Sequence, residues 1–151
     1  VDLVPTVLRA LGAPGPGHRL EGRELQTLLH GRDAATPWRD CVYSELDYSF
    51  RQARLLCGKT PQNARAWSVR TDRWRYVYWL DEREQLFDLH ADPDEYQDLG
   101  ASATHAETRL ALRQRLLEWV LRGKRRTTIS DETVEKGTNA HKRAGVYFGQ
   151  W

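Results

Sequence analysis

The sequence predicts an α+β fold, in which a small antiparallel sheet of about four strands carries one long helix. Two patterns support this prediction. Between residues 66 and 89, aromatic and β-branched residues gather in short runs separated by polar turns, which is typical of antiparallel strands. Between residues 105 and 121, apolar residues recur at the spacing of an amphipathic helix, which we expect to pack on the sheet.

The region 66–89 predicts a three-stranded meander. The runs 66–70 and 74–80 are joined by the polar link 71–73, which predicts an antiparallel hairpin. A second polar turn leads to the run 85–89. Side chains alternate across a strand, so the second run presents two different faces to its surroundings. One face is expected to carry Trp74, Tyr76 and Tyr78, and the other Arg75, Val77 and Trp79.

Two helix signals follow the meander. Asp92, Pro93 and Glu95 have the spacing of a capping box with proline at the first position, which predicts a helix start. The clearest helix covers 105–121 and ends at Gly123. Its predicted apolar side comprises Ala106, Leu110, Leu117, Val120 and Leu121, widened by Leu112, Leu116 and Trp119. Its predicted solvent side comprises Glu107, Gln114, Arg115 and Glu118.

The N-terminal residues predict two short helices. Apolar residues recur at helical spacing over 1–11, with Asp2 as a cap and Gly12 as the end. Residues 20–31 have the pattern of a second helix. The absence of methionine and the start at Val1 predict that the chain is a C-terminal piece of a longer protein.

The segment between these helices and the meander predicts one strand and one loop. Residues 41–46 have the composition of a strand. Residues 52–64, with Gly58, Pro61 and Asn63, are predicted to form a loop. A loop of this length in a compact domain is either functional or poorly ordered.

Composition narrows the function classes. The formal net charge is only +2, so wholesale binding to nucleic acid is not implied. No apolar run approaches the roughly 20 residues needed to cross a bilayer, so we expect no membrane partner. Cys41 and Cys57 form no disulfide framework, and the compartment stays open.

No arrangement of residues predicts a catalytic or metal centre. The acidic cluster lacks the glycine and the twelfth-position glutamate of a calcium loop, although calcium binding there stays an alternative. The histidines are scattered, without the spacing of zinc ligands. The acidic cluster comprises Asp88, Asp92, Asp94, Glu95 and Asp98; the histidines are His18, His30, His90, His105 and His141.

Several segments, in order along the chain, resemble the C-terminal part of the sulfatase and phosphonate monoester hydrolase family, in the alkaline phosphatase superfamily. The most specific are Asp92-Pro93-Asp94-Glu95 with Asp98-Leu99, and the closing segment 145–151. The other matching segments are 2–8, 20–23, 69–77 and 86–89, with Leu25, Leu28, Leu29 and Gly31. Each match is short, and their order over nearly the whole chain makes the resemblance specific.

This resemblance implies that the parent protein hydrolyses sulfate esters or phosphate/phosphonate monoesters. The family nucleophile is a formylglycine made from Cys or Ser in a Cys/Ser-x-Pro-x-Arg motif, beside one divalent metal ion. That motif is absent here, because Val42-Tyr43 follows Cys41 and Gly58-Lys59 follows Cys57. The resemblance therefore places the nucleophile, the metal and catalysis in a missing N-terminal domain, and no cofactor in this chain.

The resemblance also implies three parts and a supporting role. Residues 1–31 would be helices left over from a larger α/β hydrolase domain, 38–122 the C-terminal subdomain, and 123–151 a basic segment with a docking tail. Glu45, Asp47, Tyr48 and Arg51 are expected at the rim of the substrate pocket, with Arg51 meeting the anionic ester. The apolar end of the tail is expected to join subunits of a homo-oligomer.

A function from another class stays open. Arg122, Lys124, Arg125 and Arg126 form a basic run with aromatic residues elsewhere in the chain, which is compatible with a free-standing interaction or nucleic-acid-binding module. A solvated helix end explains the same run, so nucleic acid is not the expected partner.

Overall fold

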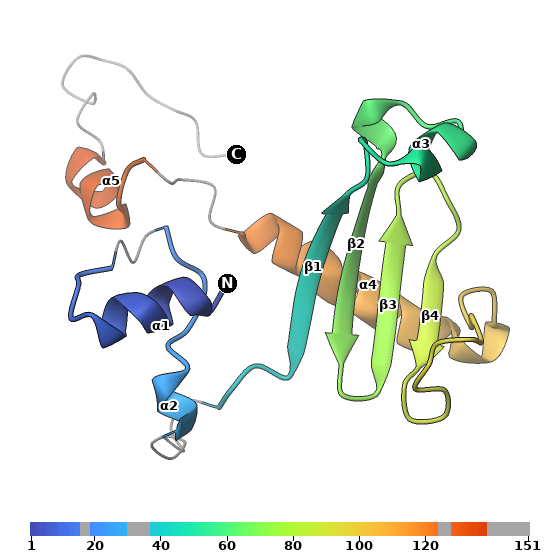
Figure 1. Ribbon diagram of the computed structural model, residues 1–151, viewed down its shortest axis with the longest axis horizontal. Helices are drawn as coiled ribbons and strands as arrows, with labels where there is room; N and C mark the ends of the chain where they lie inside the picture. The colour runs from blue at the N-terminus through green and yellow to red at the C-terminus, as the bar shows by residue number, and fades with distance from the viewer. Residues whose placement is uncertain (16–18, 30–36, 124–127, 139–151) are drawn as a thin grey trace. The chain divides into compact units, whose positions relative to one another are not determined.

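The computed structural model describes residues 1–15, 19–29, 37–123 and 128–138 (Figure 1). One compact unit spans Trp38–Gly123, and the described residues on either side of it group separately. Within this unit, four strands form one antiparallel sheet in the order β1-β2-β3-β4, and the long helix α4 lies across one of its faces. The predicted α+β class is confirmed.

The strands lie within about one residue of the predicted bounds. They are β1 (Cys41–Asp47), β2 (Arg65–Thr71), β3 (Trp74–Trp79) and β4 (Gln85–Asp88). Cross-strand partners lie on the same face of a sheet, so the register decides which side chains meet. One row of such partners runs across all four strands: Tyr43, Val69, Tyr76 and Leu86.

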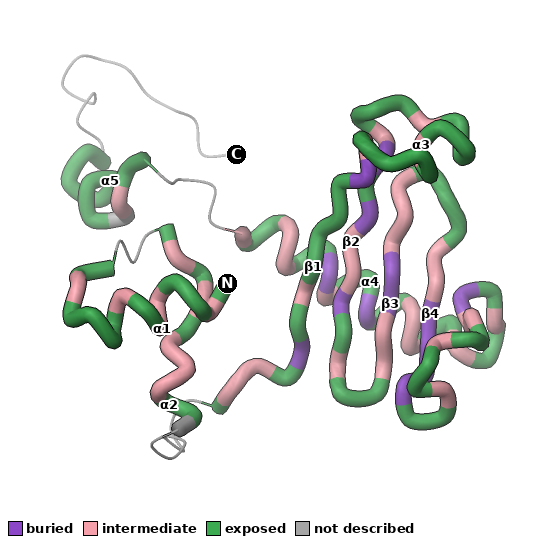
Figure 2. The backbone as a smooth tube through the Cα atoms, in the orientation of Figure 1, coloured by how far each residue is buried: buried purple, intermediate pink, exposed green. Residues whose placement is uncertain are grey.

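This row forms the floor of the main core. Val69, Tyr76 and Leu86 are completely buried and pack in one cluster with Leu112 and Leu116 of α4. Buried segments accordingly appear on β2, β3, β4 and α4 (Figure 2). Each large apolar side chain removed from water contributes about 1.5–3 kcal/mol, so this contact is the main source of stability in the unit. A second cluster, Ala66, Val77, Phe87 and Leu89, lies on the opposite face. The predicted alternation of β3 is confirmed.

The helix α4 (Ala106–Arg122) is entered through the 3-10 turn η2 (Ala103–His105) and ends at Gly123, as predicted. Its predicted apolar side is wrong in part. Leu110, Leu117 and Leu121 are 64%, 56% and 63% exposed. The residues that face the sheet are Leu112, Leu116 and Trp119, which the prediction placed at the margin of the apolar side.

Polar contacts explain this rotation of α4. Two arginines of the helix reach the carboxylate of Glu84, at 3.6 Å from Arg109 Nε and 3.1 Å from Arg113 Nη1. Arg115, predicted to face solvent, donates to Asp40 Oδ1 at 2.7 Å and to Cys41 Sγ at 3.1 Å. These bonds hold α4 from two flanks, Arg109 and Arg113 on one and Arg115 on the other, so the arc between them faces the sheet and the leucines at 110, 117 and 121 lie outward.

No helix begins at Asp92, so the predicted capping box is wrong. Glu95 adopts a left-handed conformation, with φ 61°, and its carboxylate pairs with Arg75 instead of a backbone N–H. Asp92 Oδ2 accepts a hydrogen bond from the backbone N–H of Gln97 at 2.7 Å, which closes a turn. Ion pairing with the neighbouring strand therefore overrides the local capping signal.

The loop that replaces this helix runs beside β4. The N–H of Leu99 donates to the carbonyl of Leu86 at 2.7 Å, and the N–H of Leu86 donates to Asp98 Oδ1 at 3.1 Å. Gly100 closes the loop, because a Cβ at this position would lie 2.1 Å from the carbonyl oxygen of Glu84. The close approach requires glycine at this position.

The predicted loop 52–64 contains helical structure instead. The short helix α3 (Gln52–Leu56) and the 3-10 turn η1 (Pro61–Asn63) fill most of it. The side chain of Thr60 accepts from the N–H of Asn63 and so caps the turn. These elements are too short for hydrophobic periodicity to reveal them in the sequence.

The described residues outside Trp38–Gly123 form three short helices. These are α1 (Leu3–Ala10), α2 (Gln26–Leu29), which is much shorter than predicted, and α5 (Asp131–Gly137). Gly12, at φ 66°, follows α1 as predicted. Asp2 does not cap α1 through its side chain but accepts from the backbone N–H of Arg23 at 2.8 Å. Within the described ranges, no helix has the length and apolar character needed to cross a membrane.

The ion pair of Arg73 with Asp88 predicts how stability depends on pH. Hydrogen bonds from Arg73, one of them 2.8 Å long, hold the pKa of Asp88 below its usual value of 3.8. A lowered folded-state pKa stabilises the fold above the unfolded-state pKa, and this contribution is lost as the pH falls through the folded-state pKa. We therefore expect Asp88→Asn to lower the free energy of unfolding at neutral pH.

The difference between wild type and Asp88→Asn should shrink as the pH falls below 3.8. Urea unfolding followed by circular dichroism at a series of pH values measures it. Asp94→Asn, which removes an exposed carboxylate of the same loop region, is the control and should change stability little at any pH. A difference for Asp88→Asn that is constant with pH would contradict the assignment.

Candidate functional site

The chain turns sharply where β1 ends, and three of the predicted rim residues, Asp47, Tyr48 and Arg51, lie at this turn, whereas Glu45 lies within β1 opposite Trp67. We call residues 47–59 the β1–α3 corner. The N–H of Tyr48 donates to the carbonyl of Ala64 and the N–H of Arg51 to that of Tyr48, both at 2.9 Å. Asp47 Oδ1 accepts from the N–H of Ser49 at 2.8 Å, and hydrogen bonds from Ser49 lower the pKa of Asp47. The backbone of the corner is thus held by its own bonds.

Lys59 fastens the corner to the turn between β3 and β4. Its Nζ lies 2.8 Å from Glu82 Oε1 and donates to the carbonyls of Leu80 and Asp81, both at 3.2 Å. The bond to Glu82 raises the pKa of Lys59, so the lysine stays charged. Arg54 Nε donates to the carbonyl of Ser49 at 2.7 Å. These contacts make the corner a well-supported platform.

The structure separates the four predicted rim residues into two groups. Glu45, Asp47 and Arg51 are exposed, and within the described part of the chain no ion pair involves Arg51. Tyr48 is only 6% exposed and packs edge-on against Trp79, with ring centroids 5.8 Å apart. Tyr48 therefore anchors the corner to the sheet through Trp79, whereas the side chains of Glu45, Asp47 and Arg51 are exposed to solvent.

The corner also presents an aromatic residue that the sequence analysis missed. Phe50 is completely exposed, and Leu55 and Leu56 of α3 are 65% and 79% exposed. An apolar surface on a polar, well-supported turn favours contact with another surface or ligand. The only signal in the sequence was an aromatic residue that fitted neither a strand nor a helix period.

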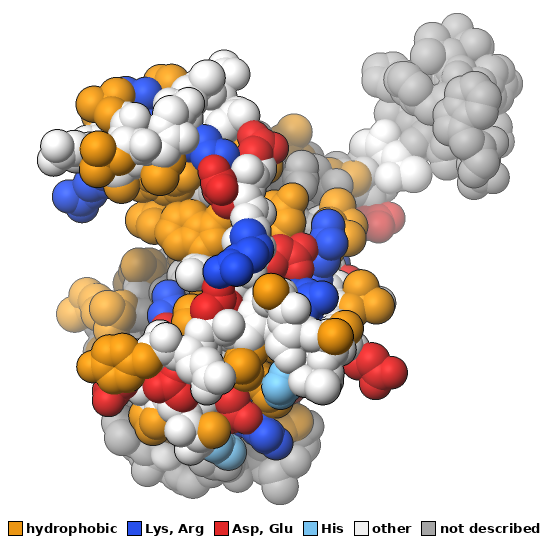
Figure 3. All heavy atoms as spheres, turned by 90° about the vertical axis from the view of Figure 1, so that its right-hand side faces the viewer, with side chains coloured by type: hydrophobic (Ala, Val, Ile, Leu, Met, Phe, Trp, Pro, Cys, Tyr) orange, Lys and Arg blue, Asp and Glu red, His pale blue; other side chains and the backbone are white. Residues whose placement is uncertain are grey.

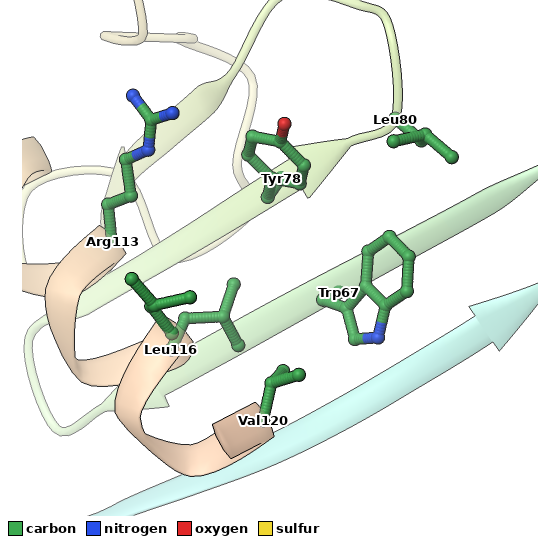
Figure 4. A pocket seen from close by; sticks show the side chains of 7 residues that line it. Trp67, Tyr78, Leu80, Arg113, Leu116 and Val120 are labelled. Atoms are coloured by element: carbon green, nitrogen blue, oxygen red, sulfur yellow. The ribbon is translucent and has the colours of Figure 1, made fainter. Parts of the chain in front are cut away.

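A second feature of the same unit is an apolar groove between α4 and the sheet, with a volume of about 320 Å³ (Figure 4). We call it the α4 groove. Trp67 and Tyr78 line it from the strands, and the side chains of α4 face them across the opening. The guanidinium of Arg113 lies 5.7 Å from the ring centre of Tyr78. The lining residues are Trp67, Tyr78, Leu80, Arg113, Leu116, Leu117 and Val120.

Four of the five residues of the acidic cluster, all except Asp94, are engaged by arginine side chains or by backbone N–H groups. Asp88 pairs with Arg73, Glu95 with Arg75, and Asp98 with Arg83. Acidic and basic side chains accordingly lie interspersed on the face shown in Figure 3. In the ranges that the structure covers, no three His, Cys, Asp or Glu side chains are grouped so as to hold a metal ion. The carboxylates of Asp88, Glu95 and Asp98 are thus each held by an arginine side chain.

The histidines and cysteines are dispersed. His90 Nε2 lies 3.2 Å from Asp72 Oδ2, and His105 Nδ1 lies 2.8 Å from the hydroxyl of Ser102. Cys41 is buried and Cys57 is exposed. His18, His30 and His141 lie outside the described residues.

The structure describes only parts of the predicted basic segment and tail, Arg122, Gly123 and residues 128–138. Arg122 Nη2 lies 3.8 Å from Glu118 Oε2 on the same helix. The rest of the basic run (124–126), residues 30 and 31 of the predicted second helix, and the apolar tail lie outside the described residues. The predictions that rest on these segments therefore stay predictions.

Similar proteins place this fold in a family. Residues 1–122 match the family model "N-sulphoglucosamine sulphohydrolase, C-terminal". The chain is 27% identical over 145 residues to the multifunctional alkaline phosphatase superfamily protein PehA of Trinickia caryophylli, which covers 91% of this chain and 27% of that protein. It is 30% identical over 106 residues to arylsulfatase K of Mus musculus, which covers 66% of this chain and 17% of that protein.

The fold has the same relatives. The phosphonate monoester hydrolase SpPMH of Silicibacter pomeroyi superposes with a TM-score of 0.74 at 28% identity, over 87% of this chain and 27% of that structure. The chain thus spans only 27% and 17% of the two curated relatives' lengths. The family model covers most of the chain, and these relatives agree with it. The chain belongs to the N-sulphoglucosamine sulphohydrolase C-terminal family, which is the C-terminal part of sulfatase-type proteins of the alkaline phosphatase superfamily.

Proposed function

We propose that this chain is the C-terminal subdomain of a larger, metal-dependent hydrolase that cleaves sulfate esters or phosphate/phosphonate monoesters. In this proposal the chain supports the fold, the pocket rim and the oligomer, and the preceding region carries the chemistry. The observation that carries the proposal is the match of residues 1–122 to a C-terminal family model, in a chain that covers 27% of PehA.

The residues of this chain do not fit the metal and the formylglycine nucleophile of the proposed parent. No described group of three acidic, histidine or cysteine side chains is arranged as ligands. Cys41 is buried, and its sulfur accepts a hydrogen bond from Arg115. Neither cysteine begins a Cys-x-Pro-x-Arg motif. Both groups are therefore assigned to the region that precedes this chain.

The helix α1 supports the proposed contact with a larger domain. Its apolar residues Leu3, Val4 and Val7 are 71%, 55% and 53% exposed, and Leu11 just after it is 75% exposed. A helix of eight residues with an exposed apolar face gains little stability by itself, because most helix stability in proteins comes from packing that face. The expected partner is the sheet of the preceding α/β domain.

The β1–α3 corner supports the proposed rim. Exposed Arg51 stands beside the completely exposed ring of Phe50 on a backbone that hydrogen bonds hold in place. A guanidinium recognises an anionic ester by charge-assisted hydrogen bonds, and its planar donors suit sulfate and phosphate oxygens. We propose that Arg51 binds the substrate at the entrance, with Glu45 and Asp47 at the same rim and Tyr48 holding the corner.

The first prediction concerns where catalysis occurs. Joined to its upstream region with a Cys/Ser-x-Pro-x-Arg motif, the chain should form a protein that cleaves 4-nitrophenyl sulfate or a 4-nitrophenyl phosphonate monoester. The 151-residue chain alone should not cleave either, because it lacks the nucleophile motif. Release of 4-nitrophenol measures both.

Two matched variants of the full-length protein separate the cysteines. Replacing the Cys or Ser of the upstream motif by Ala should abolish ester cleavage, whereas Cys57→Ala should leave the rate of cleavage unchanged. Ester cleavage by the 151-residue chain, supplied with divalent metal ions, would contradict the proposal.

The second prediction concerns the rim. In the full-length enzyme, Arg51→Ala should raise KM about tenfold and change kcat by less than about threefold, because an entrance contact is made equally in the ground and transition states. Steady-state kinetics measure both constants. Arg70→Ala removes an exposed arginine of β2 as a matched control. If Arg51→Ala leaves both constants unchanged, the rim assignment is rejected.

The third prediction concerns assembly. Residues 145–151 (GVYFGQW) are apolar, and removing an apolar contact weakens subunit association. Deletion of residues 140–151 from the full-length protein should reduce the number of subunits in the oligomer, which light scattering measures as the mass of the assembly divided by the mass of one chain. A polar replacement of Lys142 and Arg143 by Ser, which keeps the apolar end, is the control. An unchanged number of subunits after the deletion would count against an oligomer built through the tail.

A further inference from the structure

We infer that the α4 groove is the surface on which an apolar segment of the preceding catalytic region docks, alongside α4. This inference rests on the proposed function and adds the contact surface of that partner. The groove lies wholly within the compact unit Trp38–Gly123, where its walls are described.

The floor of the groove is a part of the sheet that α4 leaves uncovered. The helix covers the row of Val69, Tyr76 and Leu86. The adjacent row on the same face pairs Trp67 with Tyr78, and these two aromatic rings remain partly exposed and line the groove (Figure 4). Two large aromatic rings at an open sheet surface form a site for apolar contact.

The wall of the groove is an apolar flank of α4. Leu116 is buried at its base, Val120 is half-buried, and Leu117 is 56% exposed. Removing apolar surface from water contributes about 25 cal/mol per Å², so an occupant that covered Leu117 and the aromatic floor would be held by the hydrophobic effect. The apolar surface of the groove is therefore continuous with Leu117, one of the leucines of α4 that the sheet does not cover.

The charge at the end of the groove next to Arg113 favours an acidic residue on the occupant there. A single carboxylate, Glu84, faces the guanidiniums of both Arg109 and Arg113, at 3.6 and 3.1 Å. This cluster retains one net positive charge beside the groove. Electrostatic complementarity would place a carboxylate of the docking segment next to Arg113 and set its direction.

The chemistry of the groove and the length of the relatives select this occupant. Small-molecule sites combine apolar walls with several convergent polar groups, whereas Arg113 is the one charged side chain among the seven that line this groove. The chain covers 27% of PehA and 27% of SpPMH, so most of each of those proteins lies outside the matched region. In the parent protein a much larger region of polypeptide is thus available to cover the groove.

The test compares the reactivity of two introduced thiols. Leu117→Cys lies in the groove, and Leu110→Cys lies on the same helix outside it, at a similar exposure of 64% against 56%. Both are made in a Cys57→Ser background, in the 151-residue chain and in the full-length protein. Labelling by a maleimide dye is followed by mass spectrometry, with the same proteins lacking the introduced cysteine as blanks.

In the 151-residue chain both thiols should react at similar rates. In the full-length protein Leu117→Cys should react at least about tenfold more slowly, and Leu110→Cys should react as before, because docking protects only the groove. Equal rates for the two thiols in the full-length protein would overturn the inference.

Two further outcomes are informative. Protection of Leu117→Cys in the 151-residue chain that grows with protein concentration, together with a dimeric mass in light scattering, would assign the groove to a second copy and overturn the inference. The readout does not depend on activity: a full-length protein that protects the groove but cleaves no ester supports the docking surface while contradicting the proposed reaction.

Discussion

The structure depends on how much of a four-stranded sheet one helix can cover. A helix with its side chains is about 10–12 Å wide, whereas four strands at about 4.8 Å spacing, each several residues long, present a larger face. The helix α4 therefore seals one row of the sheet, where Val69, Tyr76 and Leu86 are completely buried. The row of Trp67 and Tyr78 stays partly open. Because one helix cannot cover the whole face of the sheet, the covered part becomes the main core and the uncovered part becomes the floor of the α4 groove.

The strands were predictable because their pattern is local. Aromatic and β-branched residues alternate between two faces in β3, and short polar links set the antiparallel pairing, so the meander and the two sides of the sheet followed from the sequence. The long helix was equally clear in its bounds. Its orientation was not, because Glu84, which draws Arg109 and Arg113 toward the sheet, is distant in sequence. Periodicity cannot register a contact with a residue some 25 positions away.

The same reason explains the missing helix at Asp92. The residues there satisfy a capping box locally, but the carboxylate of Glu95 meets Arg75 on a strand. At the candidate site, sequence reasoning selected exposed Glu45, Asp47 and Arg51, and could not foresee that Tyr48 turns inward against Trp79. Their proposed role came from a family resemblance, since their spacing alone indicates no chemistry. The α4 groove could not be predicted from the sequence, because it is lined by residues of β2, β3 and α4, which meet only in the folded chain.

The two borders of the sheet differ. At β4, the loop that follows the strand forms hydrogen bonds with the backbone groups that point away from β3. The N–H of Leu86 donates to Asp98 Oδ1, and its carbonyl accepts from the N–H of Leu99. The carbonyl of Asp88 accepts from the N–H of Asp92. At β1, no described strand lies on the outer side. The outward backbone groups of a border strand form a template on which further strands can add. Among the described residues, β1 is therefore the border of the sheet that leaves room for a further strand, and β4 is the border that its own loop has closed.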